Sequence, residues 1–108
     1  MLYTRAAQHT TEAVRLLATS AKPMGERLVN AYIYHIGTLL DDDLPDDNTR
    51  AQLERIREFF SSREPEVRGE GTAHASVRRR RRETLSRVAG QMFDLMHSVQ
   101  EHRNVSLY

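Results

Sequence analysis

The sequence predicts an all-α protein: an antiparallel helical bundle of about four helices with a long C-terminal helix. Apolar residues recur at spacings of three and four in four segments, which is the period of an amphipathic helix. No segment has the strict polar–apolar alternation that marks a half-buried strand. The connections between the segments are short, and short connections favour antiparallel neighbours in a bundle.

Composition limits the class of protein. A chain of 108 residues is expected to form one domain with a single modest core. With 39% hydrophobic and 29% charged residues, it matches a folded globular protein. The chain has no cysteine, which excludes disulfides, thiolate catalysis and cysteine-ligated zinc.

The opening MLYTRAAQHTTE lacks the apolar run of a signal peptide, and no stretch approaches the roughly 20 apolar residues of a membrane span. We therefore expect a cytoplasmic protein that does not contact membranes.

The first two helices are expected over residues 4–20 and 23–40. They are separated at Pro23, which suits the first turn of a helix because its missing N–H is not needed there. The first helix has a narrow apolar stripe of Ala6, Ala7, Ala13, Val14, Leu16, Leu17 and Ala18. The second is the most apolar segment and is expected at the centre of the bundle. Its broad apolar face consists of Leu28, Val29, Tyr32, Ile33, Ile36, Leu39 and Leu40.

The third helix is expected over residues 45–62, after the acidic segment DDDLPDDN. Carboxylates are favourable at a helix N-terminus, so these aspartates are expected to cap the third helix. Its apolar stripe is Leu44, Leu53, Ile56, Phe59 and Phe60. The segment 61–71 contains one proline and two glycines, which predicts an exposed loop.

The fourth helix is expected over residues 72–102, with Thr72 as its N-cap, because neither proline nor glycine interrupts Thr72 to Ala89. About thirty residues would span ~45 Å, against ~27 Å for the second and third helices. The start of this helix therefore either projects from the bundle or is covered by the first helix and a second copy of the chain. We expect Leu85, Met92 and Val99 to be buried by neighbouring helices, with the arginines upstream outside the core.

Charge is unevenly distributed although the net charge is only +1. Residues 1–40 carry four basic and two acidic side chains, residues 41–66 carry four and nine, and residues 67–108 carry eight and four. Fifteen of the 16 cations are arginine, which pairs with phosphate and carboxylate more effectively than lysine does.

An arginine run opens the fourth predicted helix and is the candidate contact for nucleic acid. The candidate residues are Arg78, Arg79, Arg80, Arg81, Arg82 and Arg87. Five consecutive helical residues cover about one and a half turns, so they point in nearly every direction. One use of the run is phosphate binding. The alternative is a solvated helix end whose arginines pair with Glu83 or with the aspartates of Asp41–Asp47, in one chain or across a dimer.

Metal and cofactor sites are not expected. The aspartate-rich segment lacks the glycine and the final glutamate of an EF-hand loop, and no ExxH pair of a di-metal bundle occurs. The five histidines form neither HxxxH nor HExxH. His9 with Glu12, and His35 with Tyr32 and Tyr34, are candidates for a polar patch, and the expected role of these histidines is structural or solvent-exposed.

Arg68 and His74 are separated by five residues in RGEGTAH. This spacing resembles the arginine–histidine motif of helical-bundle ribonucleases of the HEPN type, and the resemblance implies RNA cleavage. That family places the motif on a helix, whereas here it falls in a glycine-containing loop, so the likeness is confined to spacing. No phosphate loop, nucleophile elbow or catalytic triad occurs, and we expect no enzyme activity.

The apolar ridge of the fourth helix is the predicted self-association surface. Two methionines suit an adaptable interface, and a two-fold dimer is the commonest way to cover residual apolar surface. The interface residues are Leu85, Val88, Met92, Leu95, Met96 and Val99. The leading hypothesis is a non-enzymatic protein-interaction module, a small adaptor or regulator that forms a homodimer and binds an unidentified protein partner. The alternative is a nucleic-acid-binding protein that uses the arginine run.

Overall fold

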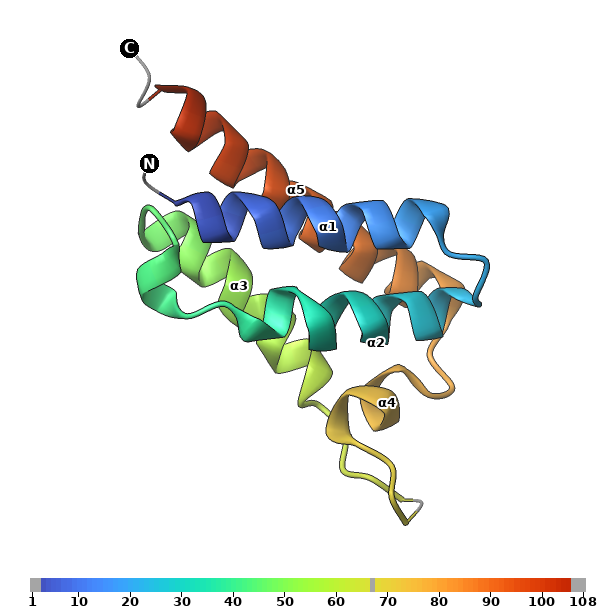
Figure 1. Ribbon diagram of the computed structural model, residues 1–108. Helices are drawn as coiled ribbons and strands as arrows, with labels where there is room; N and C mark the ends of the chain where they lie inside the picture. The colour runs from blue at the N-terminus through green and yellow to red at the C-terminus, as the bar shows by residue number, and fades with distance from the viewer. Residues whose placement is uncertain (1–2, 67, 106–108) are drawn as a thin grey trace.

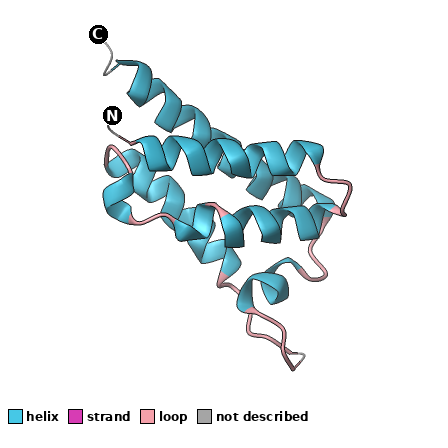
Figure 2. Cartoon of the chain, viewed as in Figure 1, coloured by secondary structure: helices cyan, strands magenta, loops and turns pink. Residues whose placement is uncertain are grey.

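The computed structural model describes residues 3–66 and 68–105, and that part of the chain is all-helical, with helices joined by loops (Figures 1 and 2). Within these residues there is no strand. The α-helices are α1 Thr4–Thr19, α2 Met24–Tyr34, α3 Asp47–Phe60, α4 Thr72–Val77 and α5 Arg82–Val105. Two short 3-10 helices, η1 Ile36–Thr38 and η2 Asp41–Asp43, connect α2 to α3.

The helices α1 and α2 lie side by side and run in opposite directions (Figure 1). The inner face of α1 is built from small side chains, with Ala6, Ala7 and Ala13 at most 2% exposed. Small side chains at a contact allow two helices to approach closely. The long helix α5 packs against both α1 and α3.

The apolar ridge of α5 is buried inside one chain. Val88, Met92, Leu95 and Val99 are at most 1% exposed, and Leu85 packs against the same core with part of its side chain still accessible. They meet Leu28 and Val29 of α2 and the α3 residues Leu53, Ile56 and Phe60 in one cluster. The prediction that neighbouring helices cover this ridge is therefore confirmed.

The second predicted helix is shorter than expected. It ends at Tyr34 instead of residue 40, because His35 leaves the helical conformation (φ −130°, ψ −72°) and the chain continues as η1. The turn depends on Gly37, where an added Cβ would lie 2.9 Å from the backbone oxygen of Tyr32. Leu39, which follows η1, is buried, whereas Leu40 is 66% exposed and Ile33 is 42% exposed. The assignment of Leu40 and Ile33 to the core face was therefore wrong.

The fourth predicted helix is divided into α4 and α5, which corrects the prediction of one continuous helix over residues 72–102. The break lies within the arginine run: Arg78 is extended (φ −64°, ψ 132°), and Arg79 is in the left-handed region (φ 59°). Like charges three or four residues apart destabilise a helix, and a run of arginines places several such pairs in one turn. The N-cap of α4 is Gly71 rather than Thr72.

The helix α3 starts where the acidic segment predicts a capped N-terminus. The Asp46 side chain accepts a hydrogen bond from the backbone N–H of Thr49 at 2.8 Å, and the Thr49 hydroxyl faces the Asp46 N–H at 3.3 Å. This reciprocal arrangement is a capping box. The prediction that an aspartate caps the third helix is confirmed, with bounds of 47–60 in place of 45–62.

None of the described helices combines the length and the apolar character needed to cross a bilayer.

Candidate functional site

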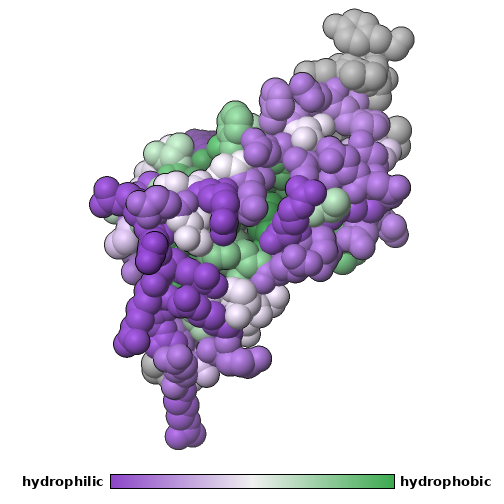
Figure 3. Space-filling model, turned by 180° about the vertical axis from the view of Figure 1, so that it is seen from behind, coloured by the Kyte–Doolittle hydropathy of each residue, from purple (hydrophilic) through white to green (hydrophobic). Residues whose placement is uncertain are grey.

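The arginine run lies at the junction of α4 and α5, at the end of the molecule that also carries the last turn of α3. We call Arg63, Arg79, Arg80, Arg81, Arg82 and Arg87 the basic junction. Seen from behind, the most hydrophilic surface gathers towards the end that carries α4 (Figure 3). Val77 of α4 lies against Gly25 in the first turn of α2, which places the junction beside the start of α2.

Arg80 is fixed in place by three contacts. Its Nε donates to the backbone oxygen of Ser76 at 2.9 Å, and its Nη2 donates to the hydroxyl of Ser62 at 2.8 Å. Its guanidinium carbon lies 5.0 Å from the ring centroid of Phe59, within the range of a cation–π contact. Burial, followed by the positive charges of Arg63 and Arg87, lowers the pKa of Arg80. The guanidinium is therefore held in a partly dehydrated position beside like charges.

Arg63 reinforces the same junction from the loop after α3. Its Nη1 donates to the backbone oxygen of Arg78 at 2.6 Å, and its backbone N–H faces the Ser76 hydroxyl at 3.3 Å. Arg63 and Arg80 thus hold the C-terminal end of α4 through oxygen atoms that carry no formal charge. Sequence reasoning missed both Arg63 and the Phe59 contact, since no pattern links residues 59–63 to residue 80.

Arg78 differs from the rest of the run, because it pairs with carboxylates of the same chain. Its Nη2 lies 2.6 Å from Glu70 Oε2 and 3.8 Å from Glu66 Oε2. Two carboxylates of the preceding loop therefore neutralise this arginine.

In the part of the chain that the structure describes, the remaining arginines of the run have no carboxylate partner. Arg79, Arg81, Arg82 and Arg87 are exposed, and within the described residues none of the four forms an ion pair. The predicted pairing with Glu83 is absent from the same part of the chain. The four guanidiniums are available to an external anion.

The aspartates of Asp41–Asp47 are not the partners of this run. Arg57 Nη1 lies 2.9 Å from Asp41, Arg5 Nε lies 3.3 Å from Asp43, and Arg50 Nη1 lies 3.0 Å from Asp47. Asp46 serves as the cap of α3. Arginines from α1 and α3 therefore pair with the aspartates of the acidic segment. The alternative, in which these aspartates pair with the arginine run of the same chain, is wrong.

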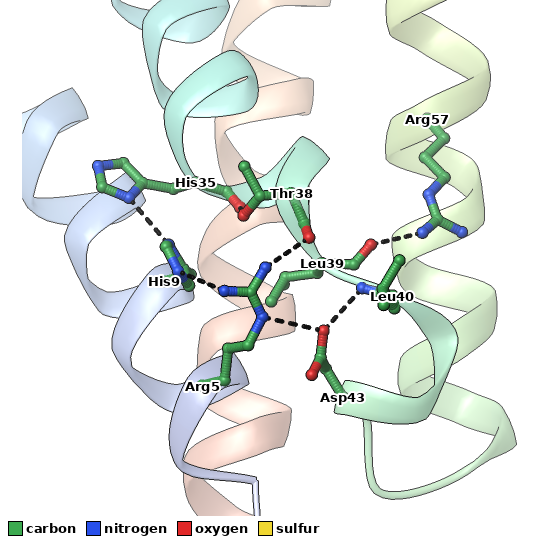
Figure 4. Close-up of polar contacts among 8 residues, drawn as sticks. All are labelled: Arg5, His9, His35, Thr38, Leu39, Leu40, Asp43 and Arg57. Atoms are coloured by element: carbon green, nitrogen blue, oxygen red, sulfur yellow. Dashed lines mark hydrogen bonds and ion pairs between the residues drawn. The ribbon is translucent and has the colours of Figure 1, made fainter.

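Two histidines that are far apart in sequence meet at the other end of α2 (Figure 4). His9 Nδ1 lies 3.2 Å from His35 Nδ1, and His9 Nε2 lies 3.2 Å from Arg5 Nη1. A guanidinium only donates hydrogen bonds, so His9 Nε2 must accept, and the proton of neutral His9 is on Nδ1. A metal ion would need a lone pair on that same Nδ1, so the contact with Arg5 disfavours metal binding at this pair.

Arg68 and His74, the pair singled out by their spacing, lie on opposite sides of the N-cap of α4. Both line a surface hollow of about 430 Å³ with Glu70 and Arg78. The carboxylate of Glu70 faces the same hollow and is bound to Arg78. The structure brings the pair together, but His74 lies on α4 and Arg68 in the loop, so the two do not share one helix.

Most residues of the predicted self-association surface are buried within one chain. Of its six residues, Val88, Met92, Leu95 and Val99 are enclosed by the helices of one chain, and Leu85 and Met96 are partly covered. A second copy cannot reach the enclosed side chains while the chain stays folded.

Comparison of the chain with protein-family models, with curated proteins and with solved structures gave no match.

Proposed function

We propose that the protein binds nucleic acid through the phosphate backbone, with the basic junction as its contact surface. The exposed arginines Arg79, Arg81, Arg82 and Arg87 would contact phosphates. Arg63 and Arg80 would act as positioning residues that hold the α4–α5 junction. This surface lies at one end of what we propose to be an antiparallel bundle.

The observation that carries the proposal is the clustering at the junction of described arginines without a carboxylate partner. Elsewhere in the described chain, Arg5, Arg50, Arg57 and Arg78 pair with a carboxylate. Within those residues, Arg15, Arg27, Arg55 and Arg68 do not, but they lie singly on four different segments. The basic junction instead gathers like charges, which repel one another until an anion binds. Neutralisation of phosphates by arginine also releases counterions from nucleic acid, which is the main source of sequence-independent affinity.

The backbone of the run supports the same proposal. Arg79 adopts φ 59°, a conformation that suits glycine or asparagine better than arginine. Such strain costs on the order of 1 kcal/mol or more and is found most often at functional sites. The α5 N-terminus at Arg82 adds the positive end of the helix dipole, which further favours an anion at this place.

The proposal is tested by measuring nucleic-acid binding of matched arginine variants by fluorescence anisotropy. Arg79→Gln, Arg81→Gln and Arg82→Gln each remove one exposed charge, and each is expected to reduce the salt dependence of binding by about one unit of slope. Arg15→Gln, on the exposed face of α1, removes the same charge outside the junction and is the control. Arg80 is left unchanged because its loss would also release Phe59 and Ser62.

The combined variant Arg79→Gln, Arg81→Gln and Arg82→Gln is expected to weaken binding at least about tenfold at low salt. Equal losses in the junction variants and in Arg15→Gln would mean that net charge alone determines affinity. That result, or no binding by the unaltered protein at low salt, would contradict the proposal.

A second candidate function is the self-associating protein-interaction module expected from the sequence. Its support is a set of large apolar side chains that remain accessible, of which Phe93, at 50% exposed, lies on α5. A dimer built on α5 would use Phe93 and its exposed neighbours in place of the buried ridge. A solution mass of twice the 12.5 kDa chain, returning to one chain in Phe93→Ala, would support this candidate.

A further inference from the structure

A chain of polar contacts joins the start of α1 to the segment that follows α2, at the end of α2 away from the basic junction (Figure 4). Arg5 is its centre. The Arg5 guanidinium donates to the backbone oxygen of Thr38 at 2.7 Å, contacts Asp43 Oδ2 at 3.3 Å and donates to His9 Nε2 at 3.2 Å. His9 then contacts His35 at 3.2 Å. One arginine and two histidines thus connect α1 with α2, η1 and η2.

The direction of each hydrogen bond follows from the donor chemistry. Arg5 donates to His9 Nε2, so neutral His9 carries its proton on Nδ1 and donates it to His35 Nδ1. His35 must accept on Nδ1 and therefore carries its own proton on Nε2. Every link of the chain is satisfied only when both histidines are neutral.

A proton on either histidine breaks a link. On His9 it would occupy Nε2, where it would face an N–H of Arg5 and put two positive charges in contact. On His35 it would occupy Nδ1, where it would face the N–H of His9. Both rings are partly buried, so water replaces the lost contacts incompletely.

We propose that the chain Arg5–His9–His35 is a pH-sensitive latch that fastens the start of α1 to the segment following α2. It is closed when both histidines are neutral and opens when either is protonated. Its opening frees the edge of the core at Ala6 and Leu39, both of which are at most 1% exposed when the latch is closed. The latch uses none of the arginines of the basic junction, so it stands independently of the proposed nucleic-acid binding.

The charges around the latch favour the neutral state of His9. Burial, then the positive charge of Arg5, then His35 lower the pKa of His9 from its ordinary value of 6.5. Asp43 of η2 acts in the opposite direction and is the weakest of these influences. From α3, Arg57 reaches the neighbouring segment by donating to the backbone oxygen of Leu39 at 2.7 Å. The pKa is lowered in the folded state, so the stability from the closed latch is complete above about pH 6.5 and is lost as pH falls through the lowered pKa.

Amide hydrogen exchange of the full chain tests the latch. Between about pH 7.5 and about pH 5.5, after correction for the chemical exchange rate, protection of residues 7–10, whose amides are the first in α1 with a helical acceptor, is expected to fall about tenfold more than protection of α3. The double variant His9→Gln and His35→Gln removes both titrating rings and is expected to abolish this difference. His97→Gln is the matched control, because His97 lies exposed on α5 and pairs with Glu101.

The ring nitrogens of the unaltered protein give a second readout that does not depend on the folding of a variant. At about pH 8, nitrogen NMR shifts are expected to place the proton of His9 on Nδ1 and that of His35 on Nε2. A proton on Nε2 of His9 would overturn the proposal. Equal changes of protection in α1 and α3, or a pH effect that persists in the double variant, would overturn it as well.

Discussion

At the scale of single residues, donor chemistry and burial determine the role of each charged group. Arginines that reach a carboxylate, such as Arg57 and Arg78, stabilise local structure. Arginines that reach only uncharged oxygens, such as Arg63 and Arg80, position the α4–α5 junction. The exposed arginines beside them form no ion pair with an acidic side chain of the described chain, and they are the proposed contacts for nucleic-acid phosphates.

Asp46 gives a prediction at this scale. Asp46→Ala removes the cap of α3 and is expected to lower the free energy of unfolding by about 1 kcal/mol, measured by urea denaturation. The hydrogen bond from the Thr49 backbone N–H lowers the pKa of Asp46 below its ordinary value of 3.8. The cap therefore stabilises the fold fully above that value and is lost as pH falls through the lowered pKa.

Asp42→Ala provides the control for this prediction, since Asp42 is exposed and caps no α-helix. Its effect on the free energy of unfolding should stay within about 0.5 kcal/mol. An effect as large as that of Asp46→Ala would show that loss of negative charge, and not loss of the cap, changes stability.

Some residue-level features were accessible from the sequence and others were not. An aspartate cap for the third helix follows from composition, because carboxylates satisfy free N–H groups at helix starts. The contact between His9 and His35 spans 26 positions, and no local pattern connects them. The spacing of Arg5 and His9 is the helical one of four residues, which is the one signal of the latch that the sequence contains.

At the scale of elements, apolar periodicity correctly identified the buried face of α5. Met92 is fully buried and its neighbour Phe93 is half exposed. Adjacent residues lie about 100° apart around a helix, so Phe93 falls outside the apolar stripe that contains Met92. Met92→Ala is expected to lower the free energy of unfolding by about 2–5 kcal/mol, and Phe93→Ala by less than about 1 kcal/mol. Chemical denaturation of the two variants measures the difference. A larger loss for Phe93→Ala would contradict the orientation of α5.

The break between α4 and α5 could not be predicted from periodicity. The absence of glycine and proline between Thr72 and Ala89 favoured one helix, and helix propensity alone agrees, because arginine is a good helix former. Tertiary contacts outweigh this preference. Arg80 is held against Phe59 and Arg63 holds the Arg78 carbonyl, and these contacts involve residues at least 15 positions apart.

At the scale of the whole molecule, the two polar sites lie at different ends of α2. The Arg5–His9–His35 latch lies beside its last turn, and the basic junction lies beside its first turn. The longest dimension of the molecule is 49 Å. Charge is unevenly distributed along the sequence, but in the fold arginines from α1 and α3 pair with Asp41, Asp43 and Asp47 of the acidic segment. The positive charge of the exposed arginines at the junction is not balanced by such ion pairs within the described chain.

The salt dependence of nucleic-acid binding measures how many arginines of the basic junction contact phosphates. Four exposed arginines at the junction predict that the logarithm of the binding constant for a generic DNA duplex falls with the logarithm of salt concentration with a slope of about −3 to −4. A slope near zero, or no binding at about 20 mM salt, would contradict the claim that these arginines bind phosphates.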